Sequence, residues 1–177
     1  MNYSRSYQSL FSLALVICSV ISLAENADNN SIPTASLKKV GESTLSYLFW
    51  DLYHARLYTE SGTYQKQEDN YALEFNYLLD IKAKDLIKET KIQWRKQKLV
   101  KHANEQAWLT ALSTIWPNVD EGDQILFYVT SEGYSEFYYN NKFVGRIKSE
   151  QFSRRFSNIW LGTNSTEPEL RDKLKGL

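Results

Sequence analysis

Cysteine is nearly absent from this sequence: Cys18 is the only one among 177 residues. It lies in an apolar N-terminal stretch that we expect to be removed, as argued below. The remaining chain would then contain no thiol. That excludes disulfide bonds, thiolate metal sites and cysteine nucleophiles, so the fold has to be held together by its hydrophobic core alone.

Residues that usually carry catalysis or bind cofactors are also scarce. The two histidines, His54 and His102, are far apart and have no partner at metal-ligand spacing. The seven glycines are scattered singly, so no phosphate-binding glycine loop is present, and no G-x-S-x-G motif occurs. We therefore predict no metal site and no cofactor, and interpret both histidines as solvated or structural.

The chain has no excess of either charge, with 21 basic and 21 acidic side chains. One basic stretch, residues 82–101, contains eight lysines and arginines. A nucleic-acid site and a solvated helix face would both produce such a stretch. We favour the helix face and predict no nucleic-acid partner, because an exported chain close to neutrality meets little nucleic acid.

The N-terminus has the pattern of a secretory signal. Arg5 is followed by an apolar run over residues 10–23, and Ser22-Leu23-Ala24 fits the small-x-small cleavage rule. A membrane anchor is the alternative, but 14 apolar residues are fewer than the roughly 20 that a spanning helix needs. A lipoprotein signal is rejected because Ile17, which is not small, precedes Cys18. We expect a signal peptide at 1–24 and a periplasmic or secreted protein without a stable membrane anchor.

After a flexible leader predicted at 25–39, one β-type run dominates the sequence. Residues 41–58 alternate so that Leu45, Tyr47, Phe49 and Tyr53 share one parity. The period of two predicts a single long strand with one buried face and a bend or bulge at Trp50-Asp51.

The other predicted elements are strands and helices in separate groups. A strand is expected at 71–77, helices from 82 and at 105–116, three strands at 125–130, 135–139 and 143–147, and helices after Ser149 and Thr166. Asn104 and Ser149 are predicted helix caps, and Thr166 begins a predicted capping box. Grouped rather than alternating elements predict an α+β fold with an antiparallel sheet. The tryptophans at 94, 108, 116 and 160 lie on helical stripes and are interpreted as core.

Several short motifs along residues 40–171 occur in a characteristic order. They are Phe49-Trp50-Asp51-x-Tyr53, Tyr77-x-x-Asp80-Ile81-Lys82, Pro117-x-Val119-x-x-Gly122-Asp123, Phe137-Tyr138 with Gly145-x-Ile147, Ile159-Trp160-Leu161, and Glu167-Pro168-x-Leu170-Arg171. This series resembles the chalcone isomerase-like family, in particular its short exported bacterial branch. The resemblance implies a domain over 40–177 with an open-faced antiparallel sheet, helices packed on one face, and an apolar cleft between the two layers.

Relatives of this kind include isomerases that close a flavonoid ring and non-catalytic proteins that hold a fatty acid in the same cleft. The enzymes use an arginine and a threonine, which fall near Ser43 and Ala55, and a tyrosine and an asparagine that residues 82–101 do not supply. The resemblance therefore implies the fold without catalytic residues. We expect Tyr53 and Tyr77 to line a cleft for a small apolar ligand such as a fatty acid. An isomerase, and a structural or partner-binding envelope protein, are the alternatives.

Overall fold

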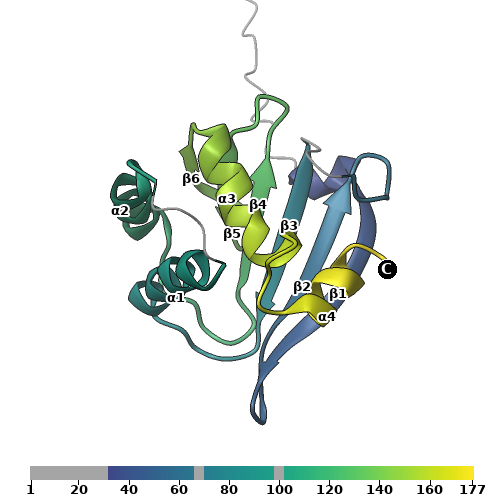
Figure 1. Cartoon of the computed structure of the whole chain (residues 1–177), viewed down its shortest axis with the longest axis horizontal. Coiled ribbons are helices and arrows are strands. Elements are labelled where there is room, and N and C mark those ends of the chain that lie inside the picture. Colours follow the sequence, from purple (N-terminus) through teal and green to yellow (C-terminus); the bar gives the residue numbers. More distant parts are fainter. Residues whose placement is uncertain (1–31, 66–69, 98–101) are drawn as a thin grey trace, which may run out of the picture.

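A six-stranded antiparallel sheet forms the centre of the molecule. The computed structural model describes residues 32–65, 70–97 and 102–177. The strands lie in the order in which they occur in the chain, so every connection joins neighbours (Figure 1). Their bounds are β1 Lys38–Tyr47, β2 Trp50–Thr59, β3 Tyr71–Tyr77, β4 Gln124–Val129, β5 Ser135–Tyr139 and β6 Lys142–Ile147.

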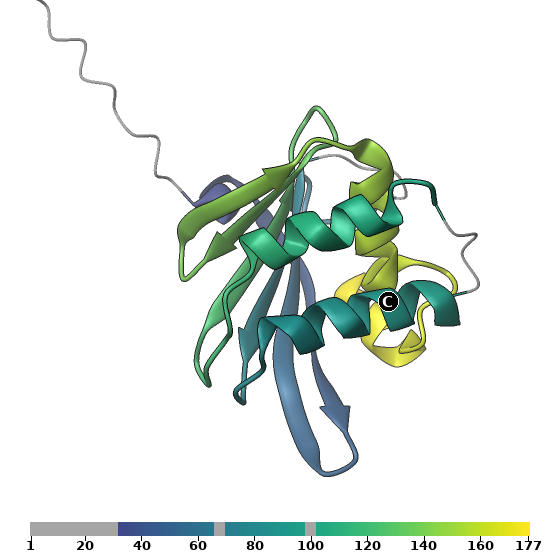
Figure 2. The same cartoon turned by 90° about the vertical axis from the view of Figure 1, so that its left-hand side faces the viewer.

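Four α-helices cover one face of this sheet (Figures 1 and 2). They are α1 Ala83–Lys96, α2 Glu105–Ile115, α3 Glu150–Leu161 and α4 Pro168–Leu174, and a 3-10 turn, η1 Pro33–Ser36, precedes β1. The predicted α+β class, with an open-faced sheet, is confirmed. The sheet begins at Lys38, two residues before the predicted start of the domain, and the predicted signal peptide at 1–24 lies outside the described residues.

The predicted single strand over 41–58 is wrong, because the chain reverses in the middle of it. Tyr47 pairs with Trp50, which leaves a two-residue turn at Leu48 and Phe49. Leu48 adopts a positive φ of 56°. Hairpin turns of this length usually contain glycine or asparagine, so this apolar turn gives no signal in the sequence.

A β-bulge explains why the alternation of apolar and polar residues along 41–58 continues unbroken through the turn. Ser46 pairs with Asp51, but Leu45 pairs with Tyr53, so Leu52 is the extra residue on β2. The extra residue shifts the register by one and returns the odd-numbered side chains of both strands to the same face. Two strands joined by a turn and a bulge therefore give the same alternating sequence pattern as one long strand.

Aromatic rings fill the space between the sheet and the helices. Phe127 and Phe137 of the sheet pack against Phe152 and Phe156 of α3, with ring centroids 4.9–6.2 Å apart. The predicted core positions Trp94, Trp108 and Trp116 are buried as well, whereas Trp160 is only partly buried.

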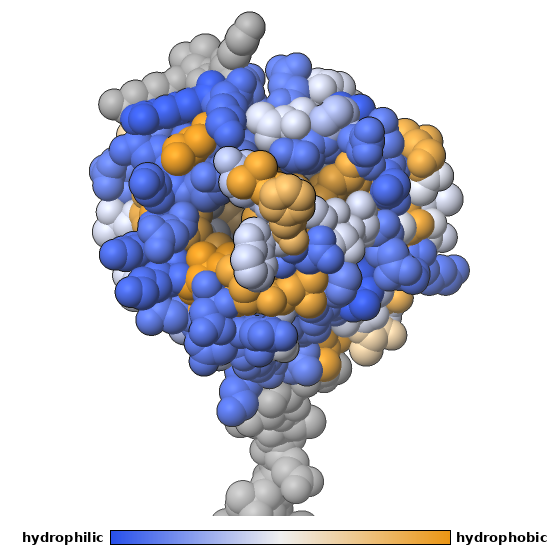
Figure 3. All heavy atoms as spheres, turned by 90° about the horizontal axis from the view of Figure 1, so that it is seen from below, coloured by the Kyte–Doolittle hydropathy of each residue, from blue (hydrophilic) through white to orange (hydrophobic). Residues whose placement is uncertain are grey.

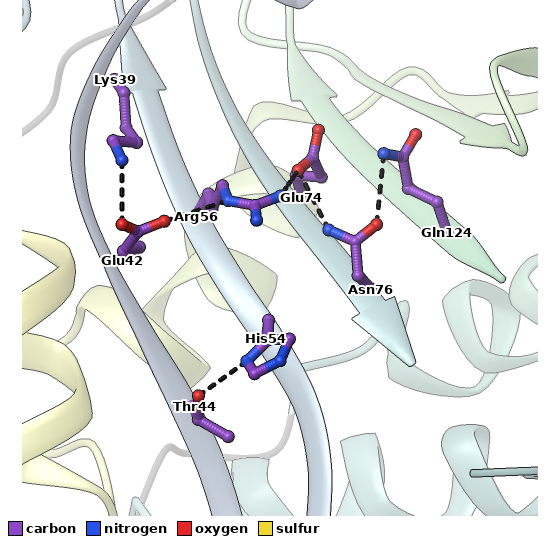
Figure 4. A network of polar contacts seen from close by, with 8 residues as sticks. All are labelled: Lys39, Glu42, Thr44, His54, Arg56, Glu74, Asn76 and Gln124. Carbon is purple, nitrogen blue, oxygen red and sulfur yellow. Dashed lines mark hydrogen bonds and ion pairs between the residues drawn. The ribbon is translucent and has the colours of Figure 1, made fainter. Parts of the chain in front are cut away.

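The other face of the sheet carries polar side chains that contact one another across the strands (Figure 4). Arg56 forms ion pairs with Glu42 at 3.1 Å and with Glu74 at 2.7 Å. On the same face, Thr44 Oγ1 lies 2.7 Å from His54 Nδ1, and both residues are away from the helical layer. His54 thus has a structural contact on the solvated face, as interpreted from the sequence.

Two of the three predicted helix caps do not form. Ser149 accepts a hydrogen bond from the backbone N–H of Phe152 and caps α3 as predicted. Asn104 makes no side-chain cap bond; instead, its backbone N–H donates to the His102 ring. The Thr166 hydroxyl donates to Gln93 of α1 at 2.8 Å rather than to its own helix. This contact connects the start of α4 to α1.

Candidate functional site

A cavity of about 540 Å³ lies between the sheet and the helices. Its floor is formed by strands β1 to β5, and its walls by α1 and α3. Apolar and aromatic side chains dominate the lining, among them Leu52, Phe75, Leu86, Ile125, Phe137 and Phe156. The volume lies within the roughly 300–1,000 Å³ that is usual for small-molecule sites.

Tyr53 projects into this cavity from β2. Its ring makes edge contacts with Phe75 at 5.3 Å and with Tyr77 at 5.9 Å. Its hydroxyl accepts a hydrogen bond of 2.8 Å from the indole N–H of Trp160, while no described residue accepts its own proton. Burial raises the pKa of Tyr53 well above the usual range, so the group is neutral and free to donate.

Tyr77 lies beside Tyr53 because the two residues are direct partners across β2 and β3. Its side chain is buried, with 7% of its surface exposed, and its hydroxyl has no hydrogen-bond partner among the described residues. Burial, followed by the nearby Tyr53, raises the pKa of Tyr77 above the usual range. The structure thus brings the two predicted ligand-binding residues together in the cavity lining.

A further feature of the lining was not foreseen from the sequence. The Trp116 ring lines the cavity with 8% of its surface exposed, whereas its indole N–H is itself buried, away from the cavity space, and has no partner among the described residues. Trp160 was likewise interpreted only as core. Both occupy the last position of a helical apolar stripe, where the tryptophan ring borders the cavity. That position is the signal that could have found them.

One rim of the cavity is polar and mostly acidic. Asp85, Glu89 and Lys96 lie on the face of α1 that borders the cavity, and Glu167 approaches from the start of α4. Gln93 donates to Glu89 at 2.8 Å and accepts from Thr166. The field at this rim is negative near Tyr53, so the site suits an uncharged oxygen acceptor better than an anion.

The positions that correspond to the arginine and threonine of the isomerases are neighbours. Ser43 and Ala55 pair directly across β1 and β2, and Ala55 is fully buried in the core. Neither residue borders the cavity, and none of its described lining residues is an arginine. Arg56, next to Ala55, points to the opposite face and is paired with Glu42 and Glu74 there.

The described residues contain no group of three or more histidine, cysteine, aspartate or glutamate side chains that could hold a metal ion. Within the same described ranges, no helix is both long enough and apolar enough to cross a membrane.

Three comparisons relate the chain to known proteins. A model of the chalcone isomerase-like family matches residues 22–176. An uncharacterised protein of Haemophilus influenzae is 28% identical over 151 residues, which cover 83% of this chain and 72% of that protein. The crystal structure of a fatty-acid binding protein from Arabidopsis thaliana has a similar fold, with a TM-score of 0.61 and 11% identity over 80% of this chain and 87% of that one.

Proposed function

Starting from the fact that this chain belongs to the chalcone isomerase-like family, we propose that it is an exported, non-catalytic binding protein. Its cavity holds a small, mostly apolar ligand such as a fatty acid. The observation that carries this proposal is an apolar, aromatic-lined cavity in which the neutral hydroxyls of Tyr53 and Tyr77 lie side by side and donate to no described residue. The fatty-acid binding protein of similar fold is consistent with the same choice of ligand.

An acyl chain suits this lining. Each methylene transferred from water into the cavity contributes about 0.8 kcal/mol, and no catalytic group is needed for that gain. The polar end of the ligand would accept hydrogen bonds from the neutral tyrosine hydroxyls, which orient it. Because Glu89 and Glu167 border the cavity, a protonated carboxyl group or an alcohol fits better than a carboxylate.

Isomerase chemistry receives little support from the same residues. A ring closure of the chalcone type passes through an anionic oxygen, and one well-placed donor to such an oxygen is worth about 10²–10³ in rate. The described cavity lining offers neutral hydroxyls and an exposed Lys96 at the far end of α1, but no guanidinium. We therefore expect no turnover of a chalcone above the spontaneous rate.

Calorimetric titration of delipidated protein with dodecanoic acid tests the proposal. We expect saturable binding of one ligand per chain, tighter at pH 5 than at pH 8, where the free acid is fully ionised. Leu86→Trp fills part of the cavity from α1 without removing a polar contact. This variant should bind dodecanoic acid more weakly than the unmodified protein. Absence of binding at either pH, equal binding by Leu86→Trp, or measurable chalcone turnover would each contradict the proposal.

A further inference from the structure

The end of the β1–β2 hairpin is the most unusual surface of the molecule. Four consecutive large apolar side chains, Tyr47, Leu48, Phe49 and Trp50, expose 68%, 77%, 97% and 70% of their surface. We call them the hairpin tip. Single exposed apolar residues are common on proteins, but a contiguous group of this size marks an interaction site.

The backbone of the tip shows that the fold does not require these residue types. Leu48 is held at a φ of 56°, in the first central position of a two-residue turn, where glycine is the favoured residue. A leucine there is strained and leaves its side chain in solvent. Strain and exposed apolar surface at one place, without a structural benefit, indicate a functional constraint.

We propose that the hairpin tip inserts into the interfacial region of a lipid bilayer. Its composition matches that environment, because tyrosine and tryptophan prefer the level of the lipid head groups, whereas leucine and phenylalanine reach further into the acyl layer. Tyr47 and Trp50 flank Leu48 and Phe49 in that arrangement. The hairpin also extends beyond the rest of the molecule (Figures 1 and 2), so the tip can enter a fluid layer first.

Shape and area argue against a second copy of the chain as the occupant. At roughly 150–250 Å² for each large side chain, the exposed tip offers on the order of 600 Å². A stable protein interface needs about 800 Å² on each partner, with complementary shapes. A narrow convex hairpin cannot provide such complementarity to another copy of itself, whereas a lipid layer adapts to it.

The cavity extends to the base of the tip. Ser46, Tyr47 and Leu52, all in the projecting part of the hairpin, belong to its lining. Seen from below, the face from which the hairpin projects shows hydrophobic residues gathered around a hollow (Figure 3). If the proposed ligand-binding function holds, an apolar ligand could pass between the acyl layer and the cavity without crossing bulk water. The tip would then be the entrance of the binding site.

Charges at this end of the molecule indicate which lipids are needed. Asp51 follows the tip directly, and the loops at the same end carry four acidic residues, Asp80, Asp120, Glu121 and Asp123, against two lysines, Lys82 and Lys142. These loops are held together by Asp80, which accepts a hydrogen bond from the backbone N–H of Glu121. Acidic surroundings do not attract anionic lipids, so insertion depends on apolar burial and should be insensitive to salt.

Vesicle flotation tests this inference. All described strands and helices lie after residue 32, so a chain starting at Glu25 keeps every one of them and lacks the apolar N-terminal run. We expect it to float with phosphatidylcholine vesicles, at low and at high salt, without gain from added phosphatidylglycerol. Phe49→Ser should reduce the bound fraction roughly fivefold or more. Phe49→Leu should retain binding, as should the control Phe143→Ser on the opposite edge strand β6.

The outcomes separate this inference from the proposed function. Because Phe49 is almost fully exposed, its replacement by serine should leave melting and the titration with dodecanoic acid in vesicle-free buffer unchanged. No flotation of the unmodified chain, or equal flotation of Phe49→Ser, would overturn the membrane inference even if the ligand binds. A dimer in analytical ultracentrifugation that Phe49→Ser abolishes would do the same. Flotation without any ligand binding would instead contradict the proposed function.

Discussion

Replacing each of the two cavity tyrosines by phenylalanine should affect the stability of the free protein differently. Both changes keep the ring and remove one hydroxyl. In Tyr53→Phe the indole N–H of Trp160 loses its acceptor at 2.8 Å. A donor left without a partner costs about 1–3 kcal/mol, and the lower end applies here because Trp160 is only partly buried. For a chain of this length, about 1 kcal/mol lowers the melting temperature by roughly 2–4 °C.

Tyr77→Phe should leave the stability of the free protein unchanged or raise it slightly. The Tyr77 hydroxyl has no hydrogen-bond partner among the described residues, and its side chain is buried. Removing a hydroxyl that has no hydrogen-bond partner among the described residues breaks no contact there, and the ring stays in the cavity lining. The pair of variants therefore distinguishes a hydroxyl that holds the fold from one that is kept for a ligand.

Ligand binding should weaken in both variants. If the ligand accepts a hydrogen bond from each hydroxyl, the loss of either bond costs about 0.5–1.5 kcal/mol, which is about 2- to 13-fold in Kd. Urea denaturation of the free proteins and calorimetric titration with dodecanoic acid measure the two quantities separately. Equal destabilisation by Tyr53→Phe and Tyr77→Phe, or unchanged affinity in both, would refute the assignment of these hydroxyls.

Three further predictions concern the scaffold. Trp108→Ala should destabilise the protein by roughly 3–5 kcal/mol in urea denaturation, because Trp108 is 95% buried among aromatic rings; a negligible change would contradict its place in the core. Gly41→Ala should loosen α4, measured as faster amide exchange there, because a Cβ at Gly41 would lie 2.1 Å from the carbonyl oxygen of Lys173. The pKa of Asp123 is lowered by the hydrogen bond from Asn140, and then by those from the backbone N–H of Asp120 and the Tyr139 hydroxyl. The free energy of unfolding should therefore fall as pH drops below about 4. In Asp123→Asn this acid dependence of stability should be weaker.

The hydrogen bond from the Tyr139 hydroxyl to Asp123 also affects stability at high pH. The hydrogen bond to Asp123 raises the pKa of Tyr139 to about 12. Stability from this bond is complete below the usual tyrosine pKa of about 10 and is lost as pH rises through about 12. Asp123→Asn should therefore reduce the dependence of stability on pH at both ends, and an unchanged pH profile would show that the contact has no energetic role.

Much of the fold follows from periodicity, and the exceptions have local physical causes. The groups of strands and helices, and the burial of Trp94, Trp108 and Trp116, were predictable because period and burial are linked. The β1–β2 hairpin was not, since its turn contains Leu48 and Phe49 instead of turn-forming residues, and the bulge at Leu52 restores the parity.

The site could be predicted only in part. Parity and family resemblance together indicated Tyr53 and Tyr77, which the structure places side by side in the cavity lining. The donor of Trp116 and the contact between Trp160 and Tyr53 depend on how two helices lie over the sheet. Side-chain periodicity shows which face of a helix is buried, but not which of its polar atoms remains without a partner.

Native mass spectrometry of the protein purified from its own compartment, without delipidation, tests the central claim most directly. The account predicts a single non-covalent adduct of one small apolar molecule per chain on the unmodified protein, displaced by added dodecanoic acid. The adduct should be lost or strongly reduced in Leu86→Trp, in which the cavity is partly filled. A protein that carries no adduct and takes up none on addition of dodecanoic acid, or an adduct that persists unchanged in Leu86→Trp, would contradict the claim that the cavity is a ligand-binding site.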